Sequence, residues 1–321
     1  MTSPSFPRLL GDVGGTNARF ALQHAPGAAL TDIRTLPAKE HPSLEVAMRH
    51  YLRLSGDVVP VEAAIGIANP VVGDWVQMTN HHWAFSIEAM RQTLGLKRFV
   101  VVNDFTALAL SLPSLQAHEW HQLGGQAPRE RAPMGLVGPG TGLGVSGLLP
   151  VGENGWVPLA GEGGHVTLSP ATPREWAVVT WLQARFGHAS AERAVSGQGL
   201  ENLYQALCAI DGVSEAPALT AAQVSQRGLA GDDVRCTEAL QLFCAWLGSV
   251  AGNLALTLGA TGGVYIGGGI APRLGLFLQR SALRERFEAK GRFQPLLANI
   301  PLLLIDAATS PALLGAARAL D

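Results

Sequence analysis

Lysine is nearly missing from this chain. Of its 23 basic residues only three are lysine, at Lys39, Lys97 and Lys290. The pattern G-x-x-x-x-G-K-[ST], whose lysine reaches the phosphates of a bound nucleotide, is absent. A phosphate site in this protein would therefore have to rely on backbone N–H groups and a metal ion.

Cysteine and net charge are also scarce. The three cysteines, Cys208, Cys236 and Cys244, are odd in number and form no C-x-x-C pair, so we expect a reduced cytoplasmic protein without zinc. The formal net charge of −2 gives no bulk attraction for nucleic acid or an anionic membrane. The N-terminus shows no apolar signal-peptide core. Residues 245–260 are too short and too rich in glycine for a membrane span, and we expect a buried helix there.

Apolar residues and glycine are abundant. Of 321 residues, 47% are hydrophobic and 15% charged, enough for one large domain or two ordinary ones. The segments RLLGDV and ARFALQ predict a strand hairpin around a glycine turn. Further strands are predicted at 61–70 and 97–105, and helices at 43–56 and 85–95. Strands that alternate with helices indicate an α/β fold.

The opening hairpin has a counterpart about 125 residues later, at 134–151. Both consist of an apolar strand, a glycine-rich turn with one threonine, and a second apolar strand. The recurrence favours a duplicated α/β domain with a cleft between the copies, although chance recurrence of glycine hairpins stays open. The second half is more helical, with helices predicted at 172–187, 200–210 and 236–256.

The last strand and helix, 301–306 and 311–320, could return to the first domain. We therefore predict a small α/β domain of residues 1–113 plus 304–321. A larger α/β domain with helical insertions would comprise residues 114–303.

Three glycine turns follow apolar strands, a pattern that points to a polyphosphate ligand. They are Gly14-Gly15-Thr16, Gly140-Thr141-Gly142 and Gly267-Gly268-Gly269. The string GTGLG resembles a dinucleotide fingerprint, but another strand follows it instead of a helix. This context argues against a dehydrogenase.

Five acidic or basic residues are candidates for chemistry. Asp12 could hold Mg²⁺ directly or through water, or could merely stabilise its turn. Asp104 follows an apolar strand, where it could face a ligand crevice or cap the next helix. Glu162 and His165 lie in the turn GEGGH and suit the hydroxyls of a polyol. Glu192 is a weaker candidate, because by itself it looks like a solvated helix charge.

Seven strings of the chain resemble the bacterial glucokinase family, in the family's order and spacing, from about residue 9 to the C-terminus. These are GDVGGTNAR (11–19), GDWVQMTNHHWAFSI (73–87), VNDFTALA (102–109), GPGTGLGV (138–145), GEGGHV (161–166), SAERAVSGQGLENLY (190–204) and GGVYIGGGIAPR (262–273). The resemblance implies two ribonuclease-H-like α/β domains with an interdomain cleft, the actin-like ATPase or hexokinase fold. It also implies phosphorylation of the C6 hydroxyl of D-glucose by ATP, the first step of glycolysis.

The same resemblance implies roles for individual residues. Asp104 would be the catalytic base, and Asn103, Asp104, Glu162, His165 and Glu192 would hold sugar hydroxyls. Residues that would bind ATP are Gly11, Asp12, Val13, Gly14, Gly15, Thr16, Gly140, Thr141, Gly142, Gly267, Gly268 and Gly269. Asp12 would place Mg²⁺, through water, and the protein would be a cytoplasmic homodimer.

Several alternatives remain open at the level of sequence. The zinc-binding cysteine cluster of the related repressor–kinase group is missing, as is an N-terminal helix-turn-helix, which argues against a sugar-responsive repressor. A kinase for another hexose, such as mannose or an N-acetylhexosamine, would share the motifs. An actin-like ATP-binding module without sugar chemistry would keep the glycine turns but would not need Asp104, Glu162 and Glu192 together.

Overall fold

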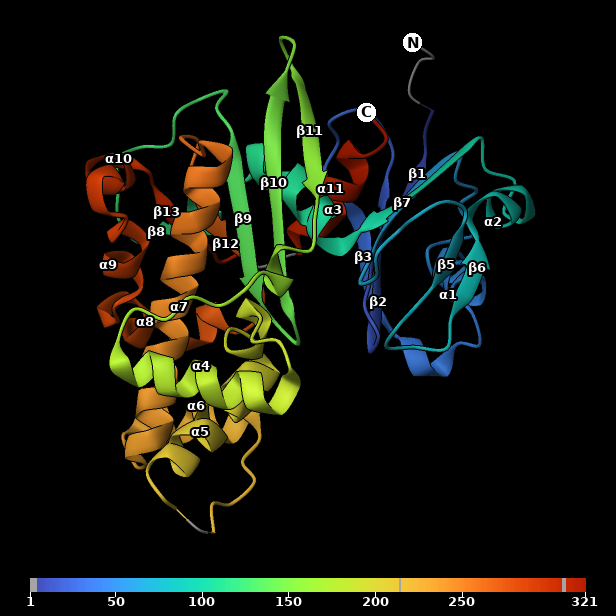
Figure 1. The fold of residues 1–321 in the computed structure, drawn as a ribbon. Helices are drawn as coiled ribbons and strands as arrows, with labels where there is room; N and C mark the ends of the chain where they lie inside the picture. Colours follow the sequence, from blue (N-terminus) through green and yellow to red (C-terminus); the bar gives the residue numbers. More distant parts are fainter. Residues whose placement is uncertain (1–4, 214, 308–309) are drawn as a thin grey trace. The chain divides into compact units, whose positions relative to one another are not determined.

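The computed structural model describes residues 5–213, 215–307 and 310–321. The chain divides into two compact units (Figure 1). The first unit comprises Met1–Ala117, Trp156–Ala160 and Ala307–Asp321, and the second comprises His118–Gly155 and Gly161–Asp306.

A five-stranded sheet forms the first unit, in the order β3-β2-β1-β4-β7. Its strands are β1 (Arg8–Val13), β2 (Asn17–Gln23), β3 (Thr31–Pro37), β4 (Glu62–Ile67) and β7 (Arg98–Asn103). β1 pairs antiparallel with β2, which confirms the predicted hairpin, and β1, β4 and β7 run parallel. The carboxyl ends of these three parallel strands therefore meet at one edge, where ligands of open α/β sheets bind.

Helices and a small second sheet complete the first unit. They are α1 (Leu44–Leu54), α2 (Ile87–Thr93), α3 (Asp104–Ser111), α11 (Pro311–Arg318), the 3₁₀ turns η1 (Ala38–Glu40) and η2 (Leu112–Ser114), and the strands β5 (Trp75–Gln77) and β6 (Ala84–Ser86). Ser43 and Ser86 cap α1 and α2, where a side-chain oxygen satisfies a free helix N–H. α11 packs on β1, β4 and α3, burying Leu313 and Ala316 against Leu10 and Ala64.

A six-stranded sheet has the order β11-β10-β9-β12-β13-β8, and its strands other than β11 belong to the second unit. Its strands are β8 (Trp120–Gln122), β9 (Met134–Pro139), β10 (Leu143–Val151), β11 (Gly155–Ala160), β12 (Val264–Ile266) and β13 (Leu302–Ile305). The five strands β11-β10-β9-β12-β13 repeat the arrangement of β3-β2-β1-β4-β7. In both sheets, three strands that are consecutive in the chain are followed by two strands that run parallel to β1 or to β9. The predicted duplication is therefore confirmed at the level of topology.

One strand lies elsewhere than predicted. β13 pairs with β12, Val264 opposite Leu302, and with β8, so the expectation that strand 301–306 returns to the first half is wrong. The chain returns to the first unit at Ala307, one residue after the end of the predicted strand. An isolated apolar strand fits either sheet, and the pairing with β12 decides between them.

Most of the second unit's core is helical. Its helices are α4 (Pro173–Phe186), α5 (Gly197–Ile210), α6 (Ala221–Ala230), α7 (Val234–Leu258), α8 (Leu276–Arg280), α9 (Leu283–Glu288) and α10 (Gln294–Asn299), with the 3₁₀ turns η3 (Ala117–Glu119), η4 (Gly163–His165), η5 (Ala191–Arg193), η6 (Ala271–Leu274) and η7 (Gly291–Phe293). α4 has the predicted cap at Thr172, proline at its first position and end at Gly187. α6 has no counterpart among the predicted helices.

α7 is the core helix of this unit. Among the described residues, α7 is the one helix whose length and composition would suffice to cross a membrane. Within its most apolar window of 18 residues, 72% is buried inside the protein. Trp246 and Phe243 are fully buried on it. This burial confirms the buried helix expected at 245–260, and α7 packs against β9 and β12 of the sheet.

Candidate active site

The turn after β1 offers free backbone N–H groups. Gly14 donates its amide to the carbonyl of Asn17 at 2.9 Å, which closes the turn. In the described part of the chain, the amides of Gly15 and Thr16 donate to no protein acceptor. A Cβ on Gly15 would lie 2.9 Å from the carbonyl oxygen of Asn80, so this position needs glycine. Free amides in a tight turn are suited to phosphate oxygens.

Asp12 is held by one of its two carboxylate oxygens. The Ser310 hydroxyl donates to Asp12 Oδ2 at 2.7 Å, and the Arg19 guanidinium reaches the same oxygen at 3.5 Å. Oδ1 has no partner among residues 5–213, 215–307 and 310–321, and within the same ranges neither oxygen accepts an N–H of the turn. The alternative that Asp12 only stabilises its own turn therefore finds no support.

Asn103, and not Asp104, is the cap of α3. The Asn103 side chain accepts from the amides of Phe105 and Thr106 at 2.9 and 3.2 Å. Asp104 is the first helical residue, with Oδ1 within 2.9 Å of the Phe105 amide and 3.0 Å of Asn103 Nδ2. The reading of Asp104 as the cap is thus wrong, because the residue before it already fills that position. Within the described chain, Asp104 Oδ2 has no hydrogen-bond partner.

The environment of Asp104 favours its neutral form. The pKa of Asp104 is raised to about 6. Burial is the main cause and the negative charge of Asp12 adds to it, against the lowering effect of the Phe105 amide. The two carboxylates lie at the ends of β1 and β7, with β4 between them. A carboxyl group whose pKa lies near neutrality at a strand end is suited to general base catalysis.

The second unit brings two glycine turns to one strand end, that of β9. Gly140 donates to the carbonyl of Gly142 at 2.8 Å and accepts from the Gly197 amide at the start of α5, also at 2.8 Å. Gly267 donates to Val137 at 2.9 Å, and Gly268, at φ +76°, packs so closely that a Cβ would collide with the Pro139 carbonyl oxygen. The amides of Thr141 and Gly142 donate to no backbone acceptor among the residues that the structure describes. This edge can therefore cradle an anion, helped by the N-terminus of α5.

Glu162, His165 and Glu192 are gathered beside that edge, because η4 and η5 pack against each other. Glu162 and His165 are exposed. Glu192 is half-buried, and its Oε2 accepts the Leu143 amide at 2.9 Å. The prediction that Glu192 is a solvated helix charge is wrong, whereas its selection as a site residue is consistent with this contact. Polar side chains with the chemistry to bind hydroxyls thus lie near one end of the glycine turn 140–142, where Glu192 contacts Leu143.

Sequence reasoning missed the two partners of Asp12. Arg19 lies directly opposite Asp12 in the β1–β2 register, so the predicted hairpin could have found it. Ser310 lies 298 residues away along the chain, and no sequence signal links it to Asp12.

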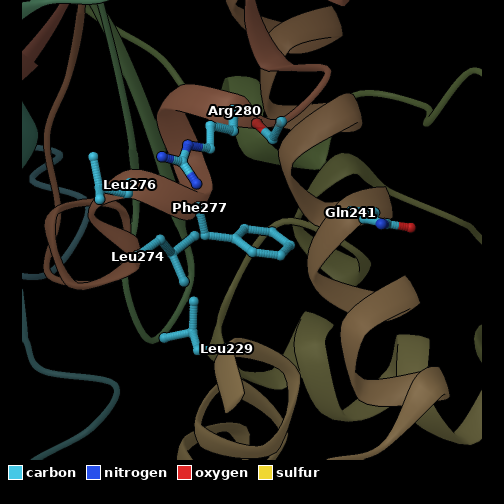
Figure 2. Close-up of a pocket in the computed structure, with 7 residues that line it drawn as sticks. Leu229, Gln241, Leu274, Leu276, Phe277 and Arg280 are labelled. Carbon is cyan, nitrogen blue, oxygen red and sulfur yellow. The ribbon is translucent and has the colours of Figure 1, made fainter. Parts of the chain in front are cut away.

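A cavity of about 500 Å³ lies in the second unit (Figure 2). One of its walls is Leu274 of η6, the 3₁₀ turn that follows the triple glycine in the chain. Its lining residues are Leu229, Gln241, Leu274, Leu276, Phe277, Arg280 and Ser281. A mostly apolar cavity of this size can accept a planar ring system.

A metal ion would have to be held mainly by the phosphates of a bound nucleotide and by water, with few protein side chains. In the residues that the structure describes, no three His, Cys, Asp or Glu side chains converge on a point that could hold a metal ion. Mg²⁺ bound with a nucleotide needs only one or two protein carboxylates besides phosphate oxygens and water. The free Oδ1 of Asp12 fits that requirement.

The chain matches known proteins over nearly its whole length. The family model described as Glucokinase matches residues 9–321. A glucokinase of Chromobacterium violaceum is 59% identical over 98% of this chain and 89% of that protein. One of Aromatoleum aromaticum is 58% identical over 99% of this chain and 96% of that protein.

Solved structures agree. The crystal structure of a glucokinase from an Antarctic psychrotroph has a TM-score of 0.90 at 36% identity, covering 98% of this chain and 99% of that one. A Balamuthia mandrillaris glucokinase, in complex with glucose, has a TM-score of 0.78 at 20% identity, covering 99% and 95%, and shows the shared fold alone.

Proposed function

The chain belongs to the glucokinase family, and on that premise we propose that it transfers the γ-phosphoryl group of ATP to the C6 hydroxyl of D-glucose. The products are ADP and glucose 6-phosphate. The observation that carries this proposal is Asp104, whose free Oδ2 and pKa of about 6 suit a base at the end of β7, close to the phosphate turn after β1.

Asp104 accepts a hydrogen bond from the C6 hydroxyl and takes its proton as the oxygen attacks phosphorus. The transition state of phosphoryl transfer is loose, so positioning and charge stabilisation contribute more than activation of the nucleophile. Asn103 Nδ2 donates to Asp104 Oδ1, which fixes the carboxylate while Oδ2 faces the substrate.

Sugar hydroxyls are held, in this proposal, by the side chains of Asn103, Asp104, Glu162, His165 and Glu192. The exposed side chains of Glu162 and His165 are available to a ligand, as is Oε1 of Glu192. A site that hydrogen-bonds a hydroxyl rejects an analogue lacking it, because its own polar groups are then left unpaired.

Phosphate oxygens are met by the free amides of Gly15, Thr16, Thr141 and Gly142, and the triple glycine 267–269 adjoins the nucleotide. Mg²⁺ supplies charge neutralisation on the β- and γ-phosphates when bound. Asp12 Oδ1 would hold it, through water. The cavity after η6 has the size and apolar lining to take the adenine ring.

The protein works, in this proposal, in the cytoplasm as a homodimer. Light scattering should then give a mass near twice the 33.7 kDa of one chain. A mass of one chain at micromolar concentration would contradict the dimer and leave the chemistry untouched.

The experiment that tests the activity is release of ADP from MgATP with glucose, mannose, fructose and N-acetylglucosamine in parallel. Turnover that depends on glucose, and exceeds the others, supports the proposal. Preference for mannose or N-acetylglucosamine would move the substrate to another hexose. ATP binding without turnover on any sugar would instead indicate a non-catalytic actin-like module.

A further inference from the structure

We propose that Glu192 is a positioning residue for the phosphate turn 140–142, so that sugar bound at Glu192 orders the turn that receives the nucleotide. This inference rests on the proposed function, in which Glu192 also holds a sugar hydroxyl. Both features belong to the second unit, so the coupling needs no movement of one unit against the other.

The contact itself is a charge-assisted hydrogen bond. Glu192 Oε2 accepts the amide of Leu143, the first residue of β10, at 2.9 Å, across 49 positions of sequence. Oε1 has no protein partner within the described residues and remains available to a ligand. Hydrogen bonds with an ionised acceptor are about twice as strong as neutral ones, so this bond can hold the end of the turn.

The turn is shaped around the carboxylate. An ideal Cβ on Gly142 would collide with Glu192 Oε2, whereas a Cβ on Gly140, two residues earlier in the same turn, would meet no atom within 4 Å. Neither glycine has a φ between +20° and +160°, so alanine is compatible with the backbone at both positions. Gly142 is therefore needed for the approach of Glu192, and Gly140 is not.

The other end of Glu192 is anchored too. The Ser196 hydroxyl donates to the backbone carbonyl of Glu192 at 2.8 Å and accepts from the Gly199 amide in the first turn of α5. The Gly197 amide of that helix donates to Gly140 at 2.8 Å. The turn is thus held at both ends by a single segment, residues 192–197, and a ligand that fixes Glu192 also fixes the turn.

The coupling is reciprocal by thermodynamic necessity. A change on the phosphate turn that displaces Glu192 must weaken sugar binding even when no nucleotide is present. The matched variants Gly142→Ala and Gly140→Ala separate this effect from a general loss of the turn, because both add one methyl group to the same turn.

Glucose binding to the nucleotide-free full chain, measured by calorimetry, tests the proposal. We expect Gly142→Ala to weaken glucose binding by about tenfold, within the usual range of coupling between sites, and Gly140→Ala to change it less than twofold. Glu192→Gln keeps an acceptor for the Leu143 amide, so hydrogen exchange at residue 143 should stay slow in that variant and become fast in Glu192→Ala.

Equal glucose affinities in the two glycine variants would overturn the proposal, as would slow exchange of the Leu143 amide in Glu192→Ala. Failure of the wild-type chain to bind glucose would overturn the proposed function instead. The calorimetry of the wild-type chain shows this independently of the variants. If Gly142→Ala unfolds, exchange at residue 143 in the wild-type chain with and without glucose decides. Slower exchange with glucose supports the coupling, and an unchanged rate contradicts it.

Discussion

A single side chain, Asp104, carries the chemistry of this account. Its Oδ1 is held by Asn103 and the Phe105 amide, and its Oδ2 is free of protein partners in the described chain. Burial raises its pKa to about 6, and the nearby charge of Asp12 adds to the effect. At neutral pH the group is therefore mostly ionised yet basic enough to accept a proton.

The pH dependence of the rate follows from this pKa. Because a base must be ionised, kcat/KM should fall as the pH drops below about 6. Asp12→Asn removes a negative charge that raises the Asp104 pKa, so the acidic limb of its profile should move to lower pH. Profiles of kcat/KM for both proteins test this. An acidic limb that stays in place, or moves upward, would contradict the assigned coupling.

The same pKa makes ionised Asp104 costly to the fold. Its pKa is higher in the folded chain than the usual 3.8, so the folded state binds more protons, and stability declines as pH rises from about 4 to 6. Asp104→Asn removes this cost and should be more stable than the wild type by about 3 kcal/mol at pH 8. The gain should vanish near pH 4, as denaturant unfolding can show. A variant less stable at pH 8 would contradict the assigned pKa.

At the scale of elements, α3 and α11 decide where Asp104 lies. Gly66 on β4 has no side chain, and a Cβ there would lie 2.9 Å from Ala107 Cβ, so α3 can approach the sheet closely. Gly315 on α11 lies so near the Ala107 carbonyl oxygen that a Cβ would collide with it. The position of the Asp104 carboxylate therefore depends on two glycines of neighbouring elements, Gly66 and Gly315.

Gly315→Ala should therefore push α11 away from α3 and displace Asp104. We expect a loss of stability of about 1–3 kcal/mol, as for other overpacked positions, with a fall in kcat larger than any change in KM for ATP. Arg318→Ala, at an exposed position of the same helix, is the control and should leave stability within about 0.5 kcal/mol. Normal kcat and stability in Gly315→Ala would contradict this dependence.

The sequence alone predicts those elements whose signals are local. α4 was predictable at both ends, because its cap residue, first-turn proline and terminal glycine all lie within 172–187. α6 was missed although it carries local signals, a capping box of Thr220 and Gln223 and a terminal Gly231; its interior glycine and only two large apolar residues, Val224 and Leu229, weaken the helical pattern, and it packs on α7. The places of Asp104, directly after a strand, and of Glu162, in a glycine turn, could be predicted, and their roles stay predictions. The bonds from Ser310 to Asp12 and from Glu192 to Leu143 could not, because they join distant segments.

At the scale of the whole molecule, the two sheets share one order over five strands, and each unit contains residues to which we assign a role. Asp12, Asn103 and Asp104 belong to the first unit, and Glu162, His165 and Glu192 to the second. Each unit has its own buried core. If glucose binds the side chains assigned to it, its binding must be visible at each of them.

Hydrogen exchange with and without glucose tests this division. We expect slower exchange at 103–106 in the first unit and at 162–166 and 191–194 in the second, because a ligand that binds the folded state suppresses local opening. Asp321, at the end of the chain, should not respond. Unchanged exchange at 103–106 would contradict the assignment of Asn103 and Asp104, and unchanged exchange at 162–166 or 191–194 would contradict that of Glu162, His165 or Glu192.

The most direct test of the central claim compares the wild type with Asp104→Asn for ADP release from MgATP in the presence of glucose, with glucose binding measured on both. We expect the variant to bind glucose within a few-fold of the wild type, while kcat falls by about 10²–10⁴, the usual contribution of a general base. Near-normal turnover in a folded variant that binds glucose would show that Asp104 is not the base.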